Sequence, residues 1–148
     1  MAIKEQIQEG IKEALKGRDQ ARLDTLRMAK GAILIKEKEK ARTEAVGDEE
    51  IIAVLRSEIR KRQQSMETYE QLGKQEAADG LKFEISVIEE FLPRQLSEAD
   101  IEAKVRAFLA EHPDMNHAGK LTGALKKELG DAADGKVLNE VCRRVLGG

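Results

Sequence analysis

The 148-residue sequence lacks the features on which several common architectures depend. It has one Cys, two Pro, no Trp and only 3% aromatic residues. A single Cys excludes an intrachain disulfide and a zinc site made of cysteines alone, and it is typical of a reducing compartment. No segment approaches the roughly 18 consecutive apolar residues that a membrane helix needs, and no signal-peptide core follows the first residue. We therefore expect a cytoplasmic protein that does not associate with membranes.

Charge is abundant but balanced. The chain has 26 Lys and Arg against 28 Asp and Glu, and these residues make up 36% of it. This fraction is well above the usual proportion of about 25%. With so few aromatics and prolines, such a composition favours exposed helices over a sheet sandwich. The small net charge of −2 excludes a highly basic nucleic-acid coat protein and an acidic tail protein.

Apolar residues recur at spacings of three and four throughout, which predicts an all-α fold. We expect four longer helices and then three short ones. Gly17 is predicted to end the first helix in the C′ position, and Asp19 and Asp48 to cap the second and third. The second helix is expected to run to about Arg42, with a loop over residues 43–47. The last helix is expected to turn Val137, Val141 and Val145 inward.

Pro93 is the clearest boundary, because proline cannot continue the helix that precedes it. Ser97, with Asp100 three residues later, has the pattern of a capping box that starts the next helix. The sequence thus predicts a bundle of about four helices over residues 1–92. A small three-helix tail domain is expected over residues 93–148.

No catalytic constellation is apparent. The serines have no nucleophile context, and Cys142 lies beside Val141, as a small buried apolar side chain would. His112, Asp114 and His117 do not match a zinc spacing. The segment that begins at Gly119-Lys120 is not a Walker A loop, since Leu121 stands where Ser or Thr is required. We expect no catalytic residues, no metal and no cofactor.

Basic residues are clustered. Residues 16–42 contain nine basic and four acidic side chains, a local net charge of +5. Such clusters can neutralise phosphates, although Lys and Arg also simply solvate helix surfaces. The aromatic residues fall on apolar stripes, which argues against base stacking and favours backbone or shape recognition of folded RNA. The candidate tRNA-binding residues are Arg22, Arg27, Lys30, Arg60, Lys61, Arg62, Gly119, Lys120, Gly123, Lys126 and Lys127.

Several strings resemble the GatB/YqeY family across essentially the whole chain. The most specific is Phe91-Leu-Pro-Arg-Gln-Leu-Ser97, and Arg22-Leu-Asp-Thr-Leu-Arg27 and Gly119-Lys-Leu-Thr-Gly123 add to it. Gly135 stands where GatB tends to have Pro, which favours the stand-alone YqeY type. GatB is the subunit of the tRNA-dependent amidotransferase whose C-terminal helical and tail domains contact tRNA. The YqeY type resembles that portion without the catalytic part.

The resemblance implies a tRNA-binding accessory protein, non-catalytic alone. A carbon–nitrogen ligase activity with glutamine as amido-N-donor would belong to a complex. An amidotransferase or aminoacyl-tRNA synthetase is a possible partner. The alternative is a helical protein–protein interaction module without RNA binding. Gly119 and Gly123, four residues apart, could serve close approach of RNA or close packing of the tail helices.

Overall fold

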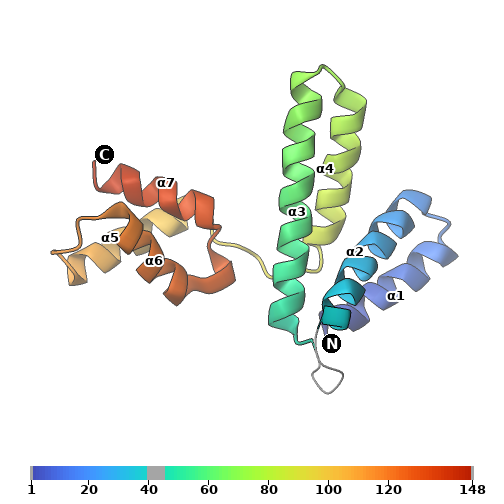
Figure 1. Ribbon diagram of the computed structural model, residues 1–148, viewed down its shortest axis with the longest axis horizontal. Helices are drawn as coiled ribbons and strands as arrows, with labels where there is room; N and C mark the ends of the chain where they lie inside the picture. The colour runs from blue at the N-terminus through green and yellow to red at the C-terminus, as the bar shows by residue number, and fades with distance from the viewer. Residues whose placement is uncertain (1, 40–45, 148) are drawn as a thin grey trace. The chain divides into compact units, whose positions relative to one another are not determined.

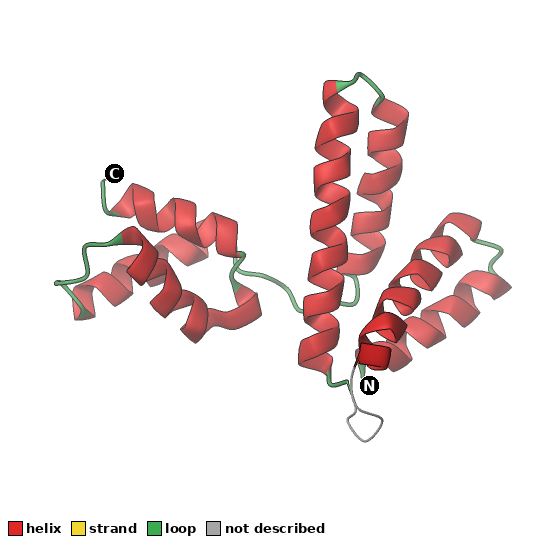
Figure 2. Cartoon of the chain, viewed as in Figure 1, coloured by secondary structure: helices red, strands yellow, loops and turns green. Residues whose placement is uncertain are grey.

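The structure is a computed structural model that describes residues 2–39 and 46–147. All regular secondary structure in these ranges is helical: seven α-helices and one short 3-10 helix (Figure 2). The predicted all-α fold is confirmed. The chain forms two compact units, Met1–Leu92 and Pro93–Gly148. None of the helices in the described ranges is long and apolar enough to cross a membrane.

The first unit consists of two helical hairpins (Figure 1). One is formed by α1 (Ile3–Lys16) and α2 (Gln20–Glu39), the other by α3 (Asp48–Gln71) and α4 (Gln75–Glu89). Helix α3 contacts each of the other three helices. Leu23, Leu26, Ala29 and Ile33 form the buried side of α2. The main core cluster comprises Ile3, Ile7, Ala29, Ile33, Ile51, Leu55, Ile59, Ile85 and Ile88.

The ends of these helices test the predicted caps and helix ends. Asp19 caps α2 as predicted, because its Oδ1 accepts a hydrogen bond from the Arg22 N–H at 3.2 Å. The prediction for Gly17 was wrong: its φ is −82°, and the left-handed residue is Arg18 at φ 56°. Helix α1 ends at Lys16, directly before Gly17, and the left-handed residue comes one position later than predicted. The Asp19 N–H then bonds the Ala14 carbonyl at 3.0 Å, the long bond of a Schellman motif centred on Arg18.

Asp48 was also wrongly predicted as a cap. Gly47 is the N-cap of α3, and Asp48 is its first residue. The Asp48 carboxylate instead accepts a hydrogen bond of 3.3 Å from the backbone N–H of Ile3, at the start of α1. A long-range partner thus takes the place of the local one. The predicted extension of the second helix to Arg42, and the start of the following loop, lie outside the described residues.

The second unit consists of α5 (Glu98–Glu111), α6 (Ala118–Leu129), a 3-10 turn (Gly130–Ala132) and α7 (Gly135–Val145) (Figure 1). Ser97 caps α5 as predicted, since its Oγ accepts a hydrogen bond from the Asp100 N–H at 3.1 Å. The predicted inner face of α7 is confirmed: Val141 is buried, and Val137 and Val145 are half-buried and pack against the same core. The core cluster comprises Ile101, Val105, Leu121, Leu125, Ala133, Leu138, Val141 and Cys142.

Candidate nucleic-acid interface

One exposed face of α6 combines two lysines with a glycine. Lys120, Gly123 and Lys127 follow one another at spacings of three and four, so they share a side of the helix. Leu121 and Leu125 point to the core on the opposite side. The side chains of Lys120 and Lys127 are exposed and form no ion pair within the described part of the chain. We call Lys120, Gly123 and Lys127 the α6 face.

Gly123 is not required by the packing of this unit. A Cβ built on it would meet no atom within 4 Å, so the helices do not approach one another there. The packing role considered for Gly123 is therefore wrong. A glycine in a helix interior costs roughly 0.5–1 kcal/mol relative to alanine. The fold gains nothing in return for this cost.

Gly119 has a different role. His117 is the N-cap of α6, and its Nδ1 accepts a hydrogen bond from the Lys120 N–H at 3.3 Å. A Cβ on Gly119 would lie 3.0 Å from Cε1 and 3.2 Å from Nδ1 of the His117 ring. The glycine therefore makes room for the imidazole that caps the helix. No packing between helices depends on it.

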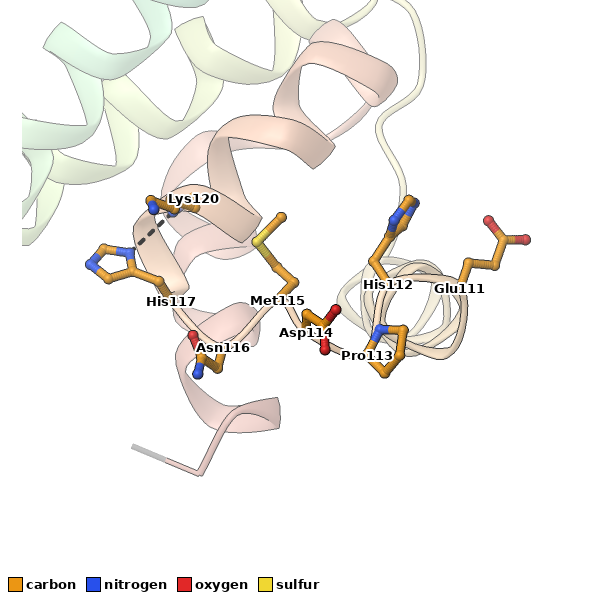
Figure 3. Close-up of a pocket in the computed structure, with 8 residues that line it drawn as sticks. All are labelled: Glu111, His112, Pro113, Asp114, Met115, Asn116, His117 and Lys120. Atoms are coloured by element: carbon orange, nitrogen blue, oxygen red, sulfur yellow. Dashed lines mark hydrogen bonds between the residues drawn. The ribbon is translucent and has the colours of Figure 1, made fainter.

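The hollow beside this cap is a pocket of about 430 Å³ at the α5–α6 connection. Figure 3 shows His117 and Lys120 on one side of it, with Glu111 and His112 on the other. Phe108 packs its ring 4.3 Å from the ring of His112, centroid to centroid. Across residues 2–39 and 46–147, no group of three or more His, Cys, Asp or Glu side chains is placed to hold a metal ion.

Lys126 on α6 makes hydrogen bonds within its own unit. Its Nζ donates to the carbonyl of Gly130 at 3.0 Å and to the carbonyl of Ala133. Gly130 ends the helix with φ 58°, where carbonyls otherwise lack partners. Lys126 thus stabilises the turn after α6, and it is not a free cation for a ligand.

Two predicted residues of the first unit are also engaged internally. Arg22 donates from both terminal nitrogens to the carboxylate of Glu90, at 2.7 and 3.2 Å. The hydrogen bond to Glu90 raises the pKa of Arg22 above its ordinary value. Arg62 is only 6% exposed and lies between the carboxylates of Glu58 at 3.2 Å and Glu84 at 3.5 Å. Arg62 was wrongly predicted as an RNA contact, because burial removes it from any ligand.

The comparison with known families settles the relationship suggested by the sequence motifs. The model of the Yqey-like protein family matches residues 4–146. The chain belongs to the Yqey-like protein family. No curated protein matches it.

The first unit of this Yqey-like chain retains four accessible cations from the predicted set. Arg27, Lys30 and Arg60 are exposed, with no ion pair in the part of the chain that the structure describes. Lys61 pairs with Glu58 at 3.1 Å, yet 70% of its side chain remains exposed. The aromatic prediction needs correction here, because Tyr69 and Phe83 are 36% and 41% exposed. Both belong to the first unit. In the second unit Phe108 is half-buried against His112, so neither unit places an exposed aromatic side chain on the α6 face.

Proposed function

We propose that this Yqey-like protein is a tRNA-binding accessory protein of the tRNA-dependent amidotransferase type, and that it is not catalytic alone. Its resemblance to the tRNA-contacting portion of GatB supports this role. The proposal places the protein in the cytoplasm, where tRNA is found. It also makes an amidotransferase or aminoacyl-tRNA synthetase the expected protein partner.

The observation that carries the proposal is the α6 face. Two unpaired lysines lie one helical turn to either side of Gly123, whose missing side chain the fold does not use. Without a Cβ, the helix backbone at Gly123 can approach a ligand closely. The lysines on either side supply the positive charge that a phosphate backbone attracts. Close approach and charge are thus combined within two turns of one helix.

The expected mode of binding is recognition of the RNA backbone and shape. Phe108 is half-buried against His112, so it cannot stack on a base without leaving that contact. Lysine contacts to phosphates position an RNA without reading its sequence. Discrimination among tRNAs would then come from RNA shape or from a protein partner.

The proposal is tested by the double variant Lys120→Glu/Lys127→Glu in a tRNA-binding titration at several salt concentrations. Loss of two phosphate contacts should weaken binding and lower the magnitude of the salt slope by about two. Lys126 is left intact, because changing it would also destabilise the turn after α6.

The matched control is Lys104→Glu. Lys104 is an exposed lysine of the same unit that lies near Leu125 and Glu128, away from the α6 face. The substitution changes the charge by the same amount per site. Because Lys104 lies outside the α6 face, its variant should alter tRNA binding only slightly. An unchanged affinity and salt slope in the double variant would contradict the assignment of the α6 face. An equal loss of tRNA affinity in the control would show that the effect comes from the overall charge of the protein.

A further inference from the structure

Helix α2 exposes large apolar side chains on a surface that its own unit does not cover. Its inner side is fully used by the core, yet Met28, Leu34 and Ile35 are 53%, 48% and 64% exposed. Single exposed apolar residues are common on protein surfaces. Met28 and Ile35, seven residues apart, share one side of α2 and form a patch there, whereas Leu34 lies about 100° around the helix from Ile35. Exposed apolar patches mark interaction sites.

Ile35 lies at a groove between α2 and α3 of about 260 Å³. Ala32 and Val54 contribute further apolar surface to its lining, and Ser57 adds a small polar one. Met28 precedes Ile35 by two helical turns, about 10.5 Å along the axis. The Met28 sulfur is 3.9 Å from Nη2 of Arg62, which places it over the buried end of α3's charged network. Lys36, Glu39, Glu58 and Lys61 complete the lining. We call this hollow, with its apolar residues Ala32, Ile35 and Val54, the α2–α3 groove; Met28 extends its apolar surface along α2.

Among the described residues, the charged side chains that line the groove pair with one another, and two cations without an ion pair follow on the same helices. Lys36 pairs with Glu39 at 3.6 Å and Lys61 with Glu58 at 3.1 Å, so the charges that line the groove balance. Lys38 and Arg60 lie three residues beyond Ile35 and Ser57 on their helices. Both are exposed and make no ion pair within the described residues. An occupant with carboxylates on its flanks therefore complements this rim.

The apolar lining distinguishes this groove from the α6 face. A phosphate backbone placed over Ile35 would lose hydration and gain no hydrogen bond from the isoleucine side chain. An apolar side chain in the same position would gain by leaving water. An amphipathic helix satisfies both requirements, since its apolar residues enter such a groove at positions i, i+3 or i+4, and i+7.

We propose that the α2–α3 groove binds an amphipathic helix of a partner protein, with apolar residues in the groove and acidic residues on its flanks. The cations Lys38 and Arg60 meet these acidic residues and orient the partner. This interaction is separate from tRNA binding by the α6 face, and neither proposal depends on the other.

The test uses two synthetic helix-stapled peptides that share one apolar stripe, one with glutamates on its flanks and one with lysines. Binding of each labelled peptide to the full chain is measured by fluorescence anisotropy. The glutamate peptide should bind, and the lysine peptide should bind about tenfold more weakly or worse, because like charges face each other at the rim.

Variants of the chain locate the binding surface. Ile35→Glu should weaken the glutamate peptide about tenfold or more, and Lys38→Glu/Arg60→Glu should weaken it while improving the lysine peptide. Leu72→Glu is the matched control, because Leu72 is 63% exposed at the end of α3, outside the groove. Circular dichroism of each variant should match that of the unchanged chain.

Four results would overturn the proposal. The first is that the glutamate peptide does not bind, or that both peptides bind equally. The second is that Leu72→Glu weakens binding as much as Ile35→Glu. The third is displacement of the peptide by tRNA, which would assign the groove to RNA. The fourth is a dimer in sedimentation that Ile35→Glu dissociates, which would make a second copy the occupant. Variants of the α6 face that weaken tRNA binding should leave the peptide affinity unchanged.

Discussion

The α6 face and the α2–α3 groove are both cationic helix surfaces, but they differ in what lies between the cations. On α6, Lys120 and Lys127 flank a bare glycine. On α2, exposed Met28, Leu34 and Ile35 lie among the cations. A bare backbone admits a polar, charged ligand at short range, whereas large apolar side chains favour an apolar partner. Similar local charge in the sequence thus corresponds to two different surfaces.

Each unit has its own spectroscopic or chemical reporter, so the two regions can be followed separately in the full chain. The chain has one Tyr and no Trp, and Tyr69 lies in the first unit. Its one Cys, Cys142, is buried in the core of the second unit. Burial raises the pKa of the Cys142 thiol, and its hydrogen bond with Thr122 offsets only part of this rise. The folded unit therefore protects Cys142 from thiol reagents.

The largest expected effect concerns the buried arginine of the first unit. Arg62→Ala should destabilise that unit by about 2–3 kcal/mol, because it leaves Glu58 and Glu84 as neighbouring carboxylates without their shared partner. Both carboxylates keep some solvent contact, so the loss is smaller than for a fully buried pair. Urea unfolding followed by Tyr69 fluorescence measures it. Arg60→Ala, an exposed neighbour, should change stability by less than about 0.5 kcal/mol; similar losses would contradict the internal role of Arg62.

Adjacent lysines of α6 should behave differently. Lys126→Ala should destabilise the second unit by about 1–2 kcal/mol, since two carbonyls at the end of α6 lose a charged donor. Lys127→Ala should leave stability nearly unchanged and weaken tRNA binding instead. The rate at which a thiol reagent modifies Cys142 under native conditions reports the stability of each variant. Equal modification rates would show that Lys126 does not support the turn.

Gly123→Ala should separate stability from binding. A methyl group at this position meets no other atom, and alanine favours the helix, so the second unit should gain about 0.5–1 kcal/mol. The same variant should weaken tRNA binding if the backbone at Gly123 approaches RNA. Gly119→Ala is the comparison, since its methyl group meets the His117 ring and opposes the gain. A stabilised variant with full tRNA affinity would exclude close approach at Gly123.

The smallest expected effect is on the acid limb of the stability profile, the fall in the first unit's stability as pH is lowered. Burial of the Glu58 carboxyl opposes ionisation, but hydrogen bonds from Lys61 and Arg62 outweigh it, so the net pKa lies below the ordinary value. A depressed folded-state pKa stabilises the fold above the unfolded pKa and loses that contribution as pH falls through the folded value. Tyr69-monitored unfolding should therefore show stability declining below about pH 4.5.

In Glu58→Gln this part of the decline should disappear, because the group no longer titrates. The exposed neighbour Glu67 serves as the matched site, and Glu67→Gln should retain the decline. An identical acid limb in Glu58→Gln and the unchanged chain would show that other carboxylates govern it.

Local signals predicted much of the fold, as two helix ends illustrate. The third helix ends at Leu72-Gly73, where Gly73 has φ 74° and the Lys74 N–H donates to the Tyr69 carbonyl at 2.8 Å. The end of α1 uses the same motif, but Arg18 takes the left-handed position in place of Gly17. Sequence indicated that a helix stops there. It did not indicate which residue bears the strain, because that depends on the turn hydrogen bonds formed with α2's cap.

The candidate site was less predictable, because side chains of one type differ by their partners. Lys126 and Lys127 are neighbours of the same residue type, yet Lys126 donates to two carbonyls and Lys127 makes no ion pair within the described part of the chain. Arg60 and Arg62 lie two residues apart on α3, yet Arg60 is exposed and Arg62 is buried. Helical periodicity alone could have flagged Arg62, since it continues the Leu55–Ile59 stripe of α3.

The helices, the boundary at Pro93 and the family could be read from the amino-acid order alone. These follow from local spacing, from proline geometry and from motifs contiguous in the chain. The packing of the helices sets which cations are available, why Gly119 and Gly123 differ, and that α2 leaves an apolar groove uncovered. Those properties depend on which distant groups pack around each side chain, and burial and pairing between helices have no contiguous signature in the sequence.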